Sequence, residues 1–154
     1  DTMQNRKFSV QISKHEFCEG KEQKDLEGYT VFVYSLPMCV AEKLRAICQQ
    51  MPEYVYTGHP CPRARDFYDI YSIITKRDVD LSSEESAELV RSVFAAKQAP
   101  LALLQKIGLE ETREFHRPDW ENVRDQIPGK SEEFDFYFDF VVQEAKKLEH
   151  LWKE

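Results

Sequence analysis

The sequence predicts an α+β protein that is predominantly helical, with two N-terminal strands followed by about six helices. Two observations predict this class: strand patterns occupy the part before residue 36, and apolar residues recur at helical spacing after it. The 154 residues suffice for one domain with its own core. No repeat or linker divides the chain, so we expect a single domain, 1–154. It comprises a strand pair with its loop (1–35), two helices (36–77) and an acidic helical region (78–154).

Two segments carry strand patterns. Residues 7–13 alternate apolar and polar side chains, which is the period of a half-buried strand. Residues 29–35 are β-branched and aromatic with little alternation, and they predict a more fully buried strand. The charged segment between them, 14–28, has no regular pattern and predicts a connecting loop.

Two helices are predicted next. Ser35 can cap the first helix, which tolerates Pro37 in its first turn and ends at Met51-Pro52. A loop over 52–62 precedes the second helix. The apolar residues expected to face the core are Val40, Ala41, Leu44, Ile47, Cys48 and Met51 in the first helix, and Phe67, Ile70, Tyr71 and Ile74 in the second.

Four further helices are predicted in the acidic region. Ser82-Ser83-Glu84-Glu85 is a capping-box signature for the first of them. Gly108 is placed to stop the next helix, and Pro128-Gly129 to stop the one after. An apolar stripe at a spacing of three or four predicts the last helix. The expected ranges are 82–100, 101–107, 118–127 and 131–152.

Charge and composition exclude several functions. The net charge is −7, and residues 78–154 hold ten basic against eighteen acidic groups. Residues 31–77 hold six basic and four acidic groups, so a nucleic acid would approach this part of the chain. The longest uncharged stretch, 28–41, is shorter than the roughly 18 residues that span a membrane. Four cysteines without CxxC spacing favour a reduced, cytoplasmic chain.

Charged residues flank the first two helical stripes. A step of 100° per residue puts Lys43 and Arg45 at opposite borders of one stripe. Asp66 and Asp69 share a flank of the other helix, where Arg65 can pair with Asp69. A lysine beside two carboxylates suits phosphoryl chemistry, because the ammonium neutralises phosphate oxygens while the carboxylates bind Mg²⁺ or orient a polar partner. Charged residues beside an apolar helical stripe are, however, usually a solvated rim, and the spacing also fits that interpretation.

Two segments in this region resemble a known family. AEKLRAI (41–47) and RARDFYDIYSI (63–73), in this order after a strand, resemble the C-terminal motifs of AbiEii/AbiGii-type nucleotidyltransferase toxins, a KLxAL-like helix and an RDxxD helix. The resemblance covers about residues 7–77. It implies a nucleotidyltransferase-like fold, and transfer of a nucleotidyl group from a nucleoside triphosphate to an acceptor with Mg²⁺. It also implies membership of a toxin–antitoxin or phage-defence system, an antitoxin protein as partner and, in some members, tRNA as acceptor.

The resemblance assigns roles by motif position. Lys43 would contact the nucleotide phosphates and Asp66 would be the functional acid, so these two are the predicted catalytic residues. Arg65 would help to bind the nucleotide, and Asp69 would be a supporting carboxylate. The family builds its metal site from a glycine-rich turn followed by a DxD pair. The five glycines of this chain are dispersed and nothing in residues 1–30 matches that site, so no metal ligand is predicted. We therefore expect the C-terminal part of a longer parent, inactive alone, with Mg²⁺ and nucleotide required by that parent.

Two other functions fit the same residues. A non-enzymatic helical interaction module, or a degenerate relative of the family, would explain the acidic region and the incomplete site. A metal-dependent nuclease would use Asp66 and Asp69 as ligands and would need further carboxylates. Two substitutions in the longer parent distinguish the transferase from the interaction module: Lys43→Ala and Asp66→Ala. If the parent is a transferase that uses these residues, it must lose activity in both variants.

Overall fold

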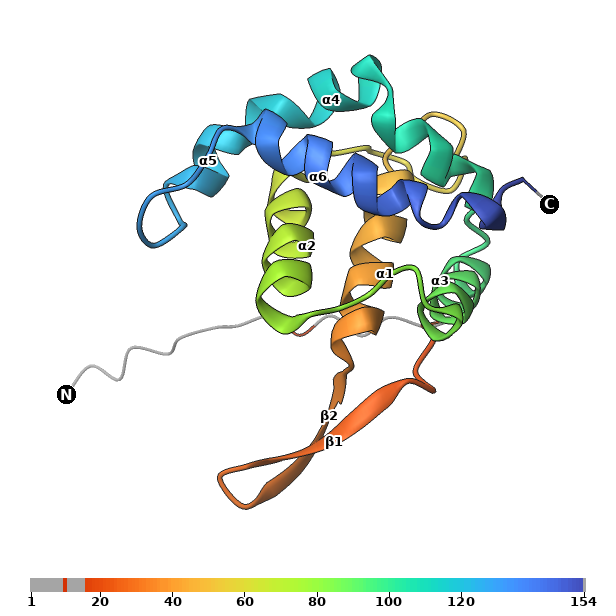
Figure 1. Ribbon diagram of the computed structural model, residues 1–154, viewed down its shortest axis with the longest axis vertical. Coiled ribbons are helices and arrows are strands. Elements are labelled where there is room, and N and C mark those ends of the chain that lie inside the picture. The colour runs from red at the N-terminus through yellow and green to blue at the C-terminus, as the bar shows by residue number, and fades with distance from the viewer. Residues whose placement is uncertain (1–9, 11–15, 154) are drawn as a thin grey trace.

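A computed structural model describes residue 10 and residues 16–153 of the chain. Within them, two strands precede six α-helices and three 3₁₀ helices, which confirms the predicted α+β, mainly helical class (Figure 1). No helix in these residues is long and apolar enough to cross a bilayer. The elements are β1 (Lys21–Leu26), β2 (Tyr29–Tyr34), α1 (Leu36–Cys48), α2 (Ala64–Arg77), α3 (Glu84–Ala96), η1 (Leu101–Gly108), α4 (Glu110–His116), η2 (Arg117–Asp119), α5 (Trp120–Arg124), α6 (Phe134–Lys146) and η3 (Glu149–Leu151).

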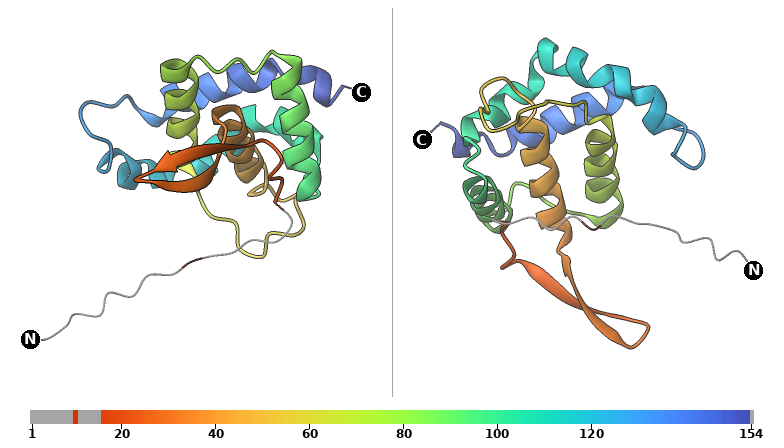
Figure 2. Two further views of the ribbon diagram at one scale, coloured as in Figure 1. Left: turned by 90° about the horizontal axis from the view of Figure 1, so that it is seen from below. Right: turned by 180° about the vertical axis from the view of Figure 1, so that it is seen from behind.

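Helix α1 lies at the centre of the molecule. It packs against α2, α3 and η1, while α6 crosses over α2 and contacts η1 (Figures 1 and 2). The hairpin β1–β2 projects from the end of α1 away from α4, α5 and α6 (Figure 1). All the core-facing residues predicted for the first helix are buried, as are Phe67 and Ile70 of the second, while Tyr71 and Ile74 are half-buried.

The hairpin corrects the predicted loop over 14–28, which contains β1. Lys21 pairs with Tyr34 and Leu26 pairs with Tyr29 in an antiparallel ladder. Pairing with β2, rather than any pattern in β1 itself, makes this segment a strand, because the hydrogen bonds of a strand are made to a partner strand. The predicted strand 7–13 lies outside the described residues except for Val10, which is exposed and not in a strand.

The strand predicted over residues 29–35 is confirmed as β2, but the prediction that it is the more fully buried strand is wrong. Tyr29 is 75% exposed and Phe32 is 60% exposed. Among the described residues β2 pairs only with β1, and the hairpin has no second layer over it. An apolar strand is buried only where other elements cover its faces, and the hairpin projects beyond the helices that could do so.

Helix boundaries follow their caps. Ser35 caps α1 as predicted, its Oγ accepting the Met38 backbone N–H at 3.3 Å. The cap of α3 is Ser83, one residue later than the predicted capping box begins, and its Oγ accepts the Ser86 N–H at 3.2 Å. Ser82 instead hydrogen-bonds to Asp80, which removes it from the helix end.

The C-terminal helices differ most from the prediction. Helix α4 was not predicted, and the helix expected over 118–127 is the short α5 with η2 before it. Gly108 is not a left-handed stop: a Cβ there would lie 3.2 Å from Cγ1 of Val142, so the glycine permits close packing of η1 on α6. Gly129 does adopt a positive φ of 90°. The last predicted helix is α6 followed by η3.

Candidate functional site

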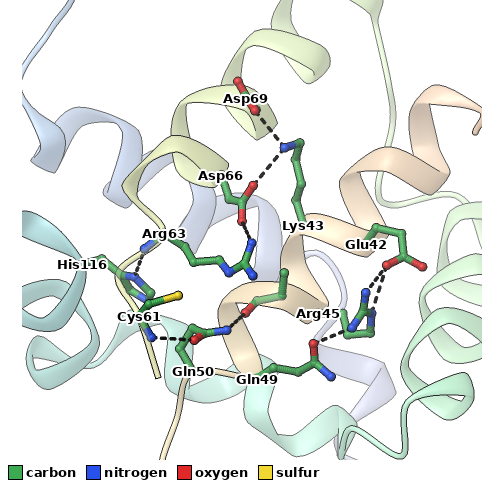
Figure 3. Close-up of polar contacts among 11 residues, drawn as sticks. Glu42, Lys43, Arg45, Gln49, Gln50, Cys61, Arg63, Asp66, Asp69 and His116 are labelled. Carbon is green, nitrogen blue, oxygen red and sulfur yellow. Dashed lines mark hydrogen bonds and ion pairs between the residues drawn. The ribbon is translucent and has the colours of Figure 1, made fainter. Parts of the chain in front are cut away.

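Helices α1 and α2 bring a lysine between two aspartates. The Nζ atom of Lys43 lies 2.9 Å from Oδ1 of Asp66 and 2.8 Å from Oδ2 of Asp69 (Figure 3). All three side chains are half-buried or nearly buried. The structure therefore joins the two predicted catalytic residues and the predicted supporting carboxylate, which come from helices far apart in the sequence.

Apolar packing fixes this arrangement. Each charged residue directly precedes a fully buried apolar residue: Leu44 follows Lys43, and Phe67 follows Asp66. The Phe67 ring stacks on Phe138 of α6 with centroids 5.5 Å apart. Because the buried neighbours set the rotation of both helices, the charged side chains meet at the border between α1 and α2.

The charge of Lys43 is maintained despite its position. Burial lowers the pKa of the ammonium, but the hydrogen bond that it donates to Asp69, together with the charge of Asp66 and the hydrogen bond donated to it, outweighs this effect, so the pKa is raised above the ordinary value. The amine is therefore protonated at neutral pH. A lysine ammonium has three donors, and the two aspartates take two of them, so one N–H is left for a ligand as far as the described residues are concerned.

Two arginines extend the site at the start of α2. The Nε of Arg65 donates to Oδ1 of Asp69 at 2.9 Å, which confirms the predicted pairing. Arg63 places Nη1 3.4 Å from Oδ2 of Asp66. Both side chains remain more than 40% exposed, at 48% and 41%. We call Lys43, Arg63, Arg65, Asp66 and Asp69 the Lys43 cluster; its three cations and two carboxylates carry a net charge of +1.

His116 supports this cluster from behind. Its Nδ1 accepts the backbone N–H of Arg63 at 2.8 Å, and its ring, 1% exposed, lies 5.2 Å from that of Phe67. Burial and the nearby charge of Arg63 lower the pKa of His116 from 6.5 to about 4. The imidazole is therefore neutral at pH 7, and Nδ1 can accept the hydrogen bond that holds the first residue before α2.

Sequence reasoning missed Arg63 and His116 as parts of the site. Arg63 was detectable as a cation three residues before Asp66. His116 is 53 residues from its partner, and no periodic signal connects them. Arg45, predicted at the border opposite Lys43, is instead 8% exposed and bonded to Glu42 and Gln49, so it belongs to a separate contact (Figure 3).

The carboxylates of the cluster do not fit Mg²⁺ as they are arranged. The Lys43 nitrogen lies within 2.9 Å of one oxygen of each aspartate, where a cation would have to be. Mg²⁺ requires near-octahedral oxygen ligands. Among the described residues, no group of three or more His, Cys, Asp or Glu could hold a metal ion. Asp66 and Asp69 act here as partners of cations, and no metal-dependent step follows from them.

Strand β2, the helix of Lys43 and the helix of Asp66 and Asp69 follow one another in the order of the two motifs that resemble the nucleotidyltransferase family. A family model described as "Nucleotidyl transferase AbiEii toxin, Type IV TA system" matches residues 5–140. The chain therefore belongs to the AbiEii nucleotidyl transferase toxin family. Comparisons with curated proteins and with solved structures found no match.

Proposed function

We propose that this chain is the phosphate-contacting part of a nucleotidyltransferase toxin, and that the Lys43 cluster binds the phosphates of a nucleoside triphosphate. The observation that carries the proposal is the position of the Lys43 ammonium, held by Asp66 and Asp69 with one donor left. The family is that of type IV toxin–antitoxin systems, which supports an antitoxin protein as partner and a cytoplasmic location.

The chemistry of the transfer suits such a cluster. Phosphoryl transfer is catalysed chiefly by positioning and by charge stabilisation on the phosphate oxygens. Lys43 would donate its remaining N–H to a phosphate oxygen, and the guanidinium groups of Arg63 and Arg65 would add charge beside it. Asp66 contacts both Lys43 and Arg63, so it would be the carboxylate that holds the two cations in register.

Three further parts of the proposal come from the family. The donor is a nucleoside triphosphate with Mg²⁺, and the acceptor is tRNA. The metal is held by residues other than Asp66 and Asp69, supplied by a longer parent protein. On this proposal the chain alone binds nucleotide but transfers nothing.

Transfer assays test the assignment of the enzyme. The chain, Mg²⁺, labelled nucleoside triphosphates and bulk tRNA should give no labelled RNA, whereas a parent protein with the upstream segment should. In that parent, Lys43→Ala and Asp66→Ala should each abolish labelling while circular dichroism shows that folding is retained. If both variants keep full activity and nucleotide binding, the cluster is structural and a helical interaction module is the better description.

A further inference from the structure

Two buried side chains hold the chain where it enters α2. Gln50 follows the last turn of α1 and is 8% exposed, and its Oε1 accepts the backbone N–H of Cys61 at 2.9 Å. His116, at the end of α4, accepts the backbone N–H of Arg63 on Nδ1 at 2.8 Å (Figure 3). Because Pro62 has no N–H, these two bonds engage every backbone donor of the three residues before α2.

Helix α2 needs such support from outside because Arg63 cannot cap it. The first N–H groups of a helix have no partner within it, and a side-chain oxygen just before the helix usually accepts one of them. Arg63 occupies that position, and a guanidinium has no acceptor. Its own N–H is bonded to His116, and its carbonyl oxygen accepts the N–H of Asp66 at 3.0 Å. His116 therefore fixes the residue from which the turn that carries Asp66 begins.

Gln50 connects the same segment to the helix that carries Lys43. Its Nε2 donates to the carbonyl oxygen of Ala46 in α1 at 2.9 Å, while its Oε1 binds Cys61. A buried amide that is bonded at both ends is held in one position. Gln50 therefore fixes the distance between α1, with Lys43, and the chain that leads to Arg63.

The contacts of the Arg63 side chain alone do not fix its guanidinium. The side chain is 41% exposed, and its Nη1 lies 3.4 Å from Oδ2 of Asp66, which is a long hydrogen bond. Its Nε is buried and has no hydrogen-bond partner among the described residues. The position of the guanidinium relative to Lys43 therefore depends on where the Arg63 backbone is held.

We propose that Gln50 and His116 are positioning residues for phosphate binding, an inference that rests on the proposed function of the Lys43 cluster. Neither residue belongs to the cluster. Each acts through a backbone N–H: Gln50 aligns the chain before α2 with α1, and His116 holds Arg63 itself. Two cations bind one phosphate group well only when they are already held at a suitable distance, because ordering them on binding costs affinity. Loss of either bond should therefore weaken phosphate binding while the helices remain folded.

Two substitutions at His116 separate the hydrogen bond from the packing of the ring. His116→Asn keeps an acceptor for the Arg63 N–H but fills less of the space beside Phe67, whereas His116→Leu fills that space and leaves the N–H unpaired. Affinity is measured by calorimetry with a nonhydrolysable nucleoside triphosphate, under conditions in which circular dichroism shows each variant to be folded. His116→Leu should bind about tenfold more weakly than the wild type, and His116→Asn should restore most of the affinity.

Two neighbouring glutamines give a matched pair of variants at the end of α1. Gln50→Leu should weaken binding by a similar factor, because it removes the bond to Cys61. Gln49→Leu is the control, since the Gln49 amide bonds to Arg45 and Tyr54 instead. The control should bind nucleotide as tightly as the wild type does.

The outcomes distinguish this inference from the proposed function. If the wild type binds nucleotide but His116→Leu or Gln50→Leu binds it equally well, the inference is wrong and the proposed function stands. The inference is also wrong if Gln49→Leu weakens binding as much as Gln50→Leu, or if His116→Asn binds as weakly as His116→Leu. A wild type that binds no nucleotide would overturn the proposed function, and the inference with it.

Discussion

Two clusters in this molecule join cations to a pair of aspartates on one helix, and only one of them suits a phosphate ligand. The Lys43 cluster lies between α1 and α2. In the other, Arg113 contacts Asp135 at 3.2 Å and Asp139 at 2.8 Å, and Arg117 contacts Asp135 at 2.9 Å. We call these four residues the Arg113 cluster. Both clusters use aspartates one helical turn apart, so spacing alone does not distinguish them.

Net charge and burial separate the two. Glu110 and Glu114 also pair with the arginines of the Arg113 cluster, so two cations face four carboxylates there. That cluster would repel a phosphate, whereas the Lys43 cluster has one positive charge in excess. The two aspartates of the Arg113 cluster are also well exposed, and exposed ion pairs are weak and screened by salt. Ion pairs therefore identify a candidate site only when the balance of charge and the burial are also considered.

The largest effect on stability is expected from Lys43→Ala. Removing the ammonium leaves Asp66 and Asp69 poorly solvated with no lysine between them, and the free energy of unfolding should fall by about 3 kcal/mol. Urea denaturation measures the loss. Adding Asp69→Asn to Lys43→Ala should recover part of it, because only one of the two carboxylates that lost the lysine is then still charged. If the free energy of unfolding fell only as little as it does on loss of an exposed ion pair, the description of Lys43, Asp66 and Asp69 as half-buried ion pairs would be contradicted.

A somewhat smaller effect is expected from acid, through His116. The unfolded histidine binds its proton near pH 6.5, but the folded one only near pH 4, so the unfolded state binds more protons between these values. Stability contributed by the neutral ring is full above pH 6.5 and is lost as pH falls toward 4. The loss between about pH 6 and about pH 4.5 should be about 2 kcal/mol.

His116→Asn isolates this contribution, because the amide oxygen can accept the Arg63 N–H but does not titrate in this range. The pH dependence of unfolding should be shallower in the variant than in the wild type by that amount. Parallel curves for the two proteins would show that the ring is not held neutral.

The smallest effect is expected from Arg113→Ala in the Arg113 cluster. Because its aspartate partners are exposed, the change in unfolding free energy should be about 1 kcal/mol or less. Part of this comes from the guanidinium above the Phe138 ring, 4.3 Å from its centroid. Urea denaturation at low and high salt separates the ion-pair share, which salt should remove. A larger loss than for Lys43→Ala would reverse the comparison.

Local periodicity explains what could be predicted. The stripes of α1 and α2 put Lys43, Asp66 and Asp69 beside buried residues, and packing of the two stripes then brings the charges together. Contacts between distant segments could not be predicted in this way. β1 depends on its ladder with β2, and the His116 bond to Arg63 joins segments with no shared pattern. The apolar pattern of β2 reports what the strand can pack against, not whether a partner is present.

Nucleotide binding tests the central claim most directly. A nonhydrolysable nucleoside triphosphate is titrated into the chain by calorimetry, with Lys43→Ala and Arg113→Ala compared under the same salt. The account predicts that the wild type and Arg113→Ala bind equally, that Lys43→Ala binds at least about tenfold more weakly, a change of about 1.4 kcal/mol, and that the wild-type affinity falls as salt rises. Equal binding by all three proteins, or weaker binding by Arg113→Ala than by Lys43→Ala, would contradict it.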